Sequence, residues 1–256
     1  MRHLNKKSRL FMASVLGAAI FGSALPASAE ITGNIGVVSN YIFRGFNQTS
    51  GGAAVQGGLT YTHESGLSLG YWGSTVDYTV VGGPSSYSGA NPVQVTGTEN
   101  DLILSYGGKV GDFGYGFGVI GYIYPQANHN NTAELNAKLS YGPLTFNAFY
   151  ALQDAYWTSQ GDVYTNLAVT LPMPNDFTFA ANAGYYFFDK GGKYLDGAVP
   201  GSFTKKSSNF TDATVSLSHP LPIKGSTMSV NYTVGGKDRT NTDIGDNAWL
   251  GLNLAF

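Results

Sequence analysis

Apolar and polar residues alternate along most of the chain, and this period of two predicts β-strands. The alternation is cleanest at 132–141, where Ala, Leu and Tyr oppose Glu, Asn, Lys and Ser. Stretches rich in Gly, Pro, Asn and Ser separate such segments and indicate turns. Each segment is near the 9–11 residues that a tilted strand needs to cross a bilayer. We predict about twelve strands, at 31–43, 53–62, 67–76, 99–107, 115–124, 132–141, 144–153, 162–171, 177–188, 210–219, 227–235 and 247–256.

The last predicted strand ends in an aromatic residue, and one of its faces is continuously apolar. That face carries Leu250, Leu252, Leu254 and Phe256. In a water-soluble protein such a strand would be an aggregation-prone edge. In an outer-membrane barrel it closes the sheet, and it resembles the C-terminal signal read by the barrel-assembly machinery. We therefore expect this machinery as a partner during biogenesis.

The predicted connections alternate in length, with short turns after even strands and long loops after odd strands. This rhythm is typical of an outer-membrane barrel with short periplasmic turns and long extracellular loops. The fold class that we predict is an all-β, transmembrane, antiparallel up-and-down barrel. The alternative is a soluble sandwich or lipocalin-like barrel, which would bury its apolar face and carry charges outside. The loops 77–98 and 189–209 either fold into the lumen or stand outward.

The N-terminus predicts a secretory signal peptide over 1–29, followed by the barrel over 30–256. Arg2, Lys6, Lys7 and Arg9 precede an apolar run, and Pro-Ala-Ser-Ala then offers a small-residue cleavage site. The run is shorter than the roughly 20 residues of a membrane-spanning helix. We expect export through the inner membrane and a location in the bacterial outer membrane.

The composition agrees with a barrel in lipid and limits the possible partners. Charged residues make up 12% of the chain and aromatic residues 14%, with 35 glycines, whereas average proteins have about 25% charged residues. The formal net charge of −2 argues against a nucleic-acid partner, which would call for clustered bases. Cysteine is absent, which excludes disulfides and thiolate metal sites. Lipid and small hydrophilic solutes are the expected partners.

The N-terminal third resembles the TorF-type proteins, a proteobacterial family of porin-like outer-membrane proteins. The resemblance departs at Asn40, where Asp is expected, and at Phe46-Asn47, where Ile-Ser is expected. It implies an outer-membrane porin-like protein without an established substrate. The matching positions are Ser39–Gly45, Gln48-Thr49, Ala54–Gly58, Tyr61, His63, Ser65-Gly66, Trp72–Ser74, Glu99 and Asp101.

Charged residues on the polar faces of the predicted strands are candidates for pore lining. Arg44, Asp101, Glu134 and Lys138 would point into the lumen, where charges set the selectivity of pores. Alternatively, Arg44 pairs with a loop carboxylate and fixes the first hairpin. Lumenal aromatic residues could stack on a ring of a specific solute. These are Trp72, Tyr122 and Tyr164.

The function predicted from the sequence is a channel for passive diffusion of small hydrophilic solutes. The alternatives are a closed structural or surface-binding barrel and a channel specific for a small metabolite. Outer-membrane phospholipases also use twelve strands, but the chain has neither a Gly-x-Ser-x-Gly elbow nor a His-Glu-x-x-His motif. We therefore expect no catalytic residues, no cofactor and no bound metal.

Overall fold

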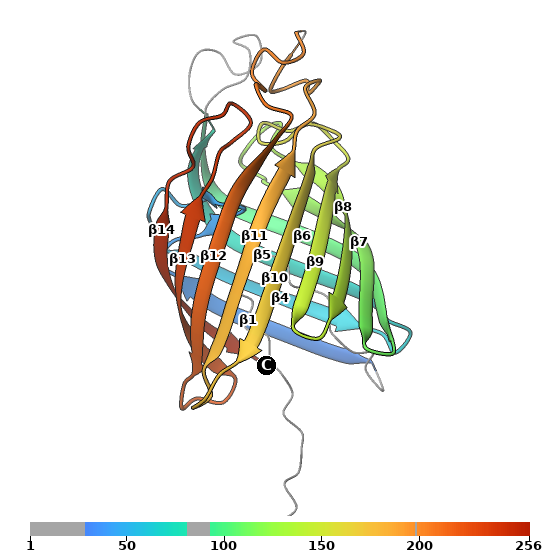
Figure 1. Cartoon of the computed structure of the whole chain (residues 1–256), viewed down its shortest axis with the longest axis vertical. Coiled ribbons are helices and arrows are strands. Elements are labelled where there is room, and N and C mark those ends of the chain that lie inside the picture. The colour runs from blue at the N-terminus through green and yellow to red at the C-terminus, as the bar shows by residue number, and fades with distance from the viewer. Residues whose placement is uncertain (1–28, 81–92, 198) are drawn as a thin grey trace, which may run out of the picture.

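Twelve antiparallel strands close into one barrel in the computed structural model, which describes residues 29–80, 93–197 and 199–256 (Figure 1). The predicted signal peptide lies outside the described residues except for Ala29. No helix in the described part of the chain is long and apolar enough to cross a membrane. The barrel strands are β1 (Glu30–Val38), β4 (Ala54–Thr62), β5 (Leu67–Val80), β6 (Val93–Val110), β7 (Phe113–Ile123), β8 (Thr132–Tyr141), β9 (Leu144–Ala151), β10 (Val163–Pro172), β11 (Thr178–Phe187), β12 (Ser208–Pro220), β13 (Ser226–Gly235) and β14 (Asn247–Ala255).

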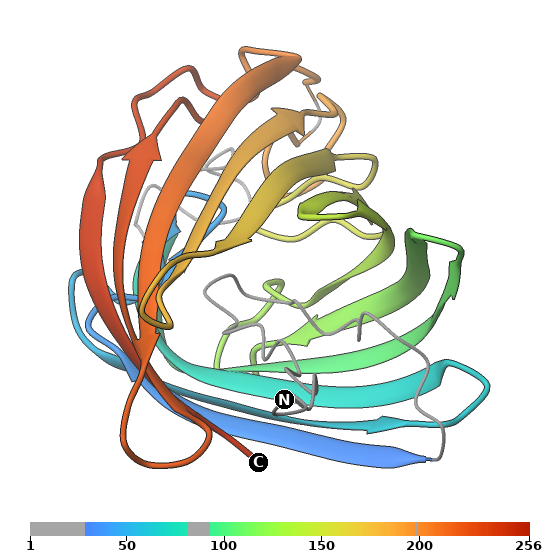
Figure 2. The same cartoon turned by 60° about the horizontal axis from the view of Figure 1, so that its bottom comes forward.

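The first and last strands close the barrel, as the sequence predicts. Each strand pairs with its neighbours in chain order, and β1 pairs with β14 with Val37 opposite Leu252. Beyond β14, Phe256 N donates to Gly33 O at 2.9 Å, and Gly33 N donates to Phe256 O at 2.8 Å. A Cβ atom at Gly33 would lie 2.6 Å from the Phe256 ring. Glycine at this position therefore lets the aromatic ring lie across β1. The predicted fold class is confirmed, and Figure 2 shows the strands as one wall around the lumen.

The wall is apolar outside and polar inside, because successive side chains of a strand point to opposite faces. This inside-out arrangement is that of a barrel embedded in lipid. Large exposed side chains on the outer face include Ile35, Leu59, Leu69, Leu104, Phe117, Leu139, Phe146, Leu167, Phe187, Leu217, Val230 and Leu252. Inward-facing polar side chains include Gln56, Ser74, Glu134, Asn136, Asn166, Asn182, Thr214, Ser216 and Asn231.

Short turns and long connections lie at opposite ends of the barrel, as the sequence predicts (Figure 1). The short turns are 63–66, 111–112, 142–143, 173–177 and 221–225. The described long connections are 39–53, 124–131, 152–162, 188–207 and 236–246.

The β5–β6 hairpin extends further than predicted, so the expected connection 77–98 is largely strand. Thr79 pairs with Gln94, and Asp77 pairs with Thr96. The Asp77 Oδ1 atom accepts hydrogen bonds from Gln94 Nε2 at 2.6 Å and from Thr96 Oγ1 at 2.8 Å. The prediction was wrong because these strand ends project beyond the apolar belt and carry polar residues outside. Residues 81–92 lie outside the described part.

Adjacent residues on β4 provide a test of the inside-out arrangement. Leu59 faces outward with 50% of its surface exposed, whereas Thr60 faces the lumen and is half-buried. We predict that Leu59→Arg lowers the free energy of unfolding by up to about 4 kcal/mol, because an arginine on the lipid-facing side of a barrel is costly. Thr60→Arg, the matched control, should cost much less because its guanidinium reaches the polar lumen. Reversible unfolding in lipid vesicles measures both. Equal costs would contradict the assigned faces.

Candidate functional site: a segment folded into the lumen

The connection 39–53 between β1 and β4 turns into the lumen instead of continuing the wall. The sequence predicts one strand to residue 43 with Tyr41 and Phe43 facing outward, and this was wrong. β1 ends at Val38, and Tyr41 is only 4% exposed. Inside the barrel, β2 (Ile42–Phe43) and β3 (Phe46–Asn47) form a separate two-stranded sheet. We call residues 39–53 the lumenal segment.

A tight turn at Arg44-Gly45 forms the tip of the lumenal segment. Both residues have positive φ, 50° at Arg44 and 88° at Gly45, as a type I′ hairpin turn requires. A Cβ atom at Gly45 would lie 2.9 Å from Thr211 O and 3.0 Å from Asp212 Cβ. The tip therefore reaches β12 across the lumen. Arg44 accepts a left-handed conformation that costs a non-glycine residue about 1–2 kcal/mol.

The Arg44 guanidinium forms a two-pronged ion pair with Glu134 on β8. Arg44 Nη1 donates to Glu134 Oε1 at 2.8 Å, and Arg44 Nη2 donates to Glu134 Oε2 at 2.6 Å. Nη1 also donates to the Tyr186 hydroxyl on β11 at 2.7 Å. The Tyr122 hydroxyl donates to Glu134 Oε2 at 2.9 Å. The two charged side chains are 5% and 2% exposed, so this is a buried, charge-assisted pair.

Aromatic rings surround the same guanidinium. Its central carbon lies 4.7 Å from the ring centroids of Phe43 and Phe149 and 4.5 Å from that of Tyr164. Cations are attracted to the faces of such rings, more strongly where water is excluded. Phe43 also meets the Tyr122 ring edge-on with centroids 6.1 Å apart. Charge and ring packing together hold the lumenal segment to strands on the opposite wall.

Carboxylates outnumber cationic groups around Arg44. Glu99 and Asp101 on β6 and Asp212 on β12 all lie within electrostatic range of the guanidinium. Asp212 Oδ1 accepts a hydrogen bond from the Tyr164 hydroxyl at 3.1 Å. The charge of Arg44 is balanced by Glu134, and the other three carboxyl groups lie around this pair.

The structure brings most of the predicted pore-lining residues together. Arg44, Glu134, Asp101 and Tyr164 share one buried region. Trp72 packs against Tyr41 of the lumenal segment, with ring centroids 5.7 Å apart. Lys138 faces the lumen further along β8, toward the short turns. The predicted assembly-signal residues all point outward: Leu250, Leu252, Leu254 and Phe256.

Sequence reasoning missed the lumenal segment and its aromatic partners Phe149 and Tyr186. The available signal was the Arg44-Gly45 pair between Phe43 and Phe46, a Gly-containing turn flanked by apolar residues. The partners themselves come from strands distant in sequence.

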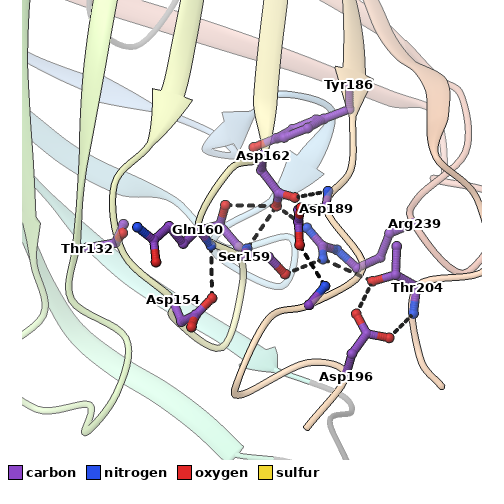
Figure 3. A network of polar contacts seen from close by, with 12 residues as sticks. Thr132, Asp154, Ser159, Gln160, Asp162, Tyr186, Asp189, Asp196, Thr204 and Arg239 are labelled. Carbon is purple, nitrogen blue, oxygen red and sulfur yellow. Dashed lines mark hydrogen bonds and ion pairs between the residues drawn. The ribbon is translucent and has the colours of Figure 1, made fainter. Parts of the chain in front are cut away.

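A second polar network ties three long connections together at the rim (Figure 3). Arg239 pairs with Asp162, and its Nη1 donates to Ser159 Oγ at 2.9 Å and to Thr204 Oγ1 at 3.1 Å. Asp162 Oδ1 accepts from Asp189 N at 2.8 Å. Burial raises the pKa of the Asp162 carboxyl above its ordinary value, and Arg239 opposes this effect. The network joins the connections 152–162, 188–207 and 236–246.

The loop 189–209, expected either to enter the lumen or to stand outward, corresponds to the connection 188–207, which Asp196 organises within the rim. This carboxylate is buried and accepts from the backbone N of Phe203 and Thr204 at 2.8 Å each. Tyr194 of the same connection stacks on His129, with ring centroids 4.7 Å apart. The described part of this connection therefore packs against its neighbours. Residue 198 lies outside the described part.

Comparisons with known proteins agree with the barrel. A model of the family described as "Bacterial protein of unknown function (Gcw_chp)" matches residues 23–250. A search of curated proteins finds no match. The chain is similar to the COG4313 outer membrane channel from Pseudomonas putida F1, with 13% identity, a TM-score of 0.52, and coverage of 93% of this chain and 97% of that one.

A second similar structure is described as "KdgM porin", with 9% identity and a TM-score of 0.51. The match covers 88% of this chain and 98% of that chain. At such identities the likeness shows a shared fold. These matches do not test the predicted TorF-type identity, which stays a prediction.

Removing one partner of the buried pair should strongly destabilise the barrel. Glu134→Gln leaves the guanidinium buried without its carboxylate, and we predict a loss of about 3–5 kcal/mol in the free energy of unfolding. The double variant Arg44→Met/Glu134→Gln should recover part of that loss, because no unpaired charge remains. Equilibrium unfolding by denaturant measures both variants.

The exposed pair of Lys237 and Asp243 supplies the control, with side chains 44% and 84% exposed. Asp243→Asn should change stability by less than about 1 kcal/mol. A Glu134→Gln variant as stable as Asp243→Asn would show that the lumenal pair does not hold the segment.

Proposed function

We propose that this chain, which belongs to the Gcw_chp family of bacterial proteins of unknown function, is an outer-membrane channel for passive diffusion of small hydrophilic solutes. The main observation behind this proposal is a closed barrel wall with an apolar outer face and a polar inner face. The structures described as a porin and as an outer membrane channel share this fold. The predicted signal peptide would supply export, and the closing strand would be engaged by the assembly machinery.

The lumen toward the short turns supports the proposal. Its inward side chains there include Asn34, Gln56, Thr60 and Asn253, which are half-buried. Asn34 Nδ2 donates to Asn253 Oδ1 at 3.0 Å across the closing strands. Neutral amides and hydroxyls of this kind suit water and uncharged polar solutes.

The lumenal segment would be the constriction of the channel. A solute must pass beside it or displace it, and the charges that it would meet are those of Arg44, Asp101, Glu134 and Lys138. Charged rings at a narrow point select permeating ions. The excess of carboxylates favours cations over anions.

The burial of the residues around the Arg44–Glu134 pair favours a second candidate, a closed structural or surface-binding barrel. Glu134 and Tyr122 are each 1% exposed, so solvent barely reaches the ion pair. A channel specific for a ring-containing metabolite is less favoured, because Trp72 and Tyr164 already contact Tyr41 and Arg44. We assign no catalytic activity.

Single-channel recording separates the channel from the closed barrel. We predict steady ohmic current steps when the refolded protein is inserted into a planar bilayer, because the polar lumen would connect the two sides of the bilayer. Folding is checked independently by the shift in electrophoretic mobility on heating. A correctly folded barrel that gives no current would overturn the channel function.

Replacing Arg44 should change both conductance and selectivity. In Arg44→Ala the cation of the constriction is lost, while Glu134 loses its counter-charge and the carboxyl groups of Glu99, Asp101 and Asp212 remain. We predict a larger conductance and a reversal potential shifted toward cation selectivity under a salt gradient. Lys237→Ala, which removes a positive charge from the exposed rim, is the matched control. Identical reversal potentials for wild type and Arg44→Ala would remove Arg44 from the selectivity filter.

A further inference from the structure

The barrel wall supplies a cage of side chains around the Arg44 guanidinium. Its members come from four consecutive strands and are Glu134 on β8, Phe149 on β9, Tyr164 on β10 and Tyr186 on β11. Phe149 pairs with Tyr164, and Tyr164 pairs with Tyr186, so the three rings form one row across neighbouring strands. We call these four wall residues the guanidinium cage. The lumenal segment contributes the guanidinium and the Phe43 ring.

Contacts within the wall hold the cage in place independently of the guanidinium. The Tyr122 hydroxyl donates to Glu134 Oε2 at 2.9 Å. The Tyr164 hydroxyl donates to Asp212 Oδ1 at 3.1 Å, and the centroids of the Tyr164 and Tyr186 rings lie 5.1 Å apart. All of these side chains stand on paired strands of the barrel. The cage is therefore pre-organised, which lowers the cost of binding.

The geometry of the cage suits a guanidinium group. One carboxylate accepts both terminal nitrogens of Arg44, at 2.8 Å and 2.6 Å, and the Tyr186 hydroxyl accepts from one of them at 2.7 Å. Such forked pairing needs the planar donors of a guanidinium, whereas an ammonium group provides only a point charge. The Phe149 and Tyr164 rings attract a cation that has left water. A neutral solute of the same shape would leave the buried Glu134 carboxylate without a counter-charge.

Arg44 reaches the cage from a part of the chain that does not belong to the wall. In the lumenal segment, β2 and β3 pair with each other in a sheet of their own. The tip adopts a positive φ at Arg44, which residues with a side chain rarely do. A free guanidinium would occupy the cage without this backbone strain. Arg44 therefore has the position of a ligand that is tethered to the site by its own chain.

We propose that the guanidinium cage is a binding site for a small solute that carries a guanidinium group, and that Arg44 competes for it as a tethered ligand. A solute that displaces Arg44 would free the tip of the lumenal segment from its ion pair with Glu134. Binding follows from the cage itself, whereas entry of the solute through the lumen rests on the proposed channel function. Short flexible tethers give effective concentrations on the order of millimolar. The site is therefore tested in a chain that lacks the Arg44 side chain.

Arg44→Ala in the full refolded chain vacates the cage, and ethylguanidinium replaces the part of the side chain that is lost. We expect titration calorimetry in neutral detergent to give one ethylguanidinium per chain. The melting temperature, followed by circular dichroism, should rise by about 3–6 °C at roughly ten times the Kd. Propylammonium should bind more weakly because it cannot form the forked pair. Ethylurea, which has the shape without the charge, should leave the melting temperature unchanged.

Three further chains control for effects outside the cage. The wild type should bind ethylguanidinium at least about tenfold more weakly than Arg44→Ala, because the tethered guanidinium competes. Arg44→Ala/Glu134→Gln, in which the carboxylate of the cage is absent, should lose both the binding heat and the thermal shift. Lys237→Ala, which removes an exposed cation at the rim, should respond as the wild type does.

If Arg44→Ala does not fold alone, refolding with ethylguanidinium should restore the folded yield and refolding with ethylurea should not. Three results would overturn the site. These are an Arg44→Ala chain that responds to neither compound, one that responds equally to both, and a double variant that keeps the response.

Current recording separates this inference from the channel function. Ethylguanidinium should lower the single-channel conductance of Arg44→Ala with the Kd found by calorimetry, because the bound cation narrows the constriction. Binding heat without current in either chain would support the cage and overturn the channel. Steady current that ethylguanidinium does not change, together with the absence of binding heat, would overturn the cage and support the channel.

Discussion

Charge inside a lipid-embedded barrel must be balanced by other groups inside the barrel, and this constraint explains the lumen. The outer face in contact with lipid consists of apolar side chains, so charged residues in the middle of the strands, such as Asp101, Glu134 and Lys138, point inward. There they lose much of their hydration as the lumenal segment fills the space. Arg44 balances the charge of Glu134 through two hydrogen bonds. The flat face of its guanidinium also packs against the surrounding aromatic rings. A lysine would provide only a point charge in the same position.

The same constraint accounts for the strained turn at the tip of the segment. A non-glycine residue at positive φ persists where its surroundings over-determine it, and Arg44 makes such contacts with β8, β10 and β11. Gly45 then allows the backbone to approach β12. The backbone strain and the ion pair are therefore linked, because this turn directs the guanidinium toward Glu134 and Tyr186.

The alternation of apolar and polar residues, here called strand parity, predicted the fold well. Residues that face lipid in a barrel are apolar, so every strand carries the same pattern. The boundaries of β8, β10 and the closing strand were close to those observed. Parity failed after Val38, because Tyr41 and Phe43 continue the outward phase of β1 in sequence while the chain leaves the wall. The wall partners end there: Val38 is the last residue of β1 paired with β4 and β14. Sequence periodicity cannot report where hydrogen-bonding partners end.

The sequence predicted which strand residues face the lumen, but it did not predict which of them contact one another. Parity placed Asp101 and Glu134 in the lumen, but their partners depend on distances between strands that are not neighbours. No local pattern announces that Tyr186 on β11 will meet a guanidinium from residue 44.

A continuous series of packed side chains connects the Arg44–Glu134 pair to the polar network at the rim. Arg44 donates to the Tyr186 hydroxyl, the Tyr186 ring stacks on Phe188 with centroids 5.0 Å apart and planes 10° apart, and the Arg239 guanidinium lies 5.0 Å from the centroid of Phe188. Arg239 in turn pairs with Asp162 between the long connections. Displacing the lumenal segment would remove the hydrogen bond that orients Tyr186 and so loosen the stack beneath Arg239. The constriction and the ordered loops are therefore packed as one body rather than as two independent features.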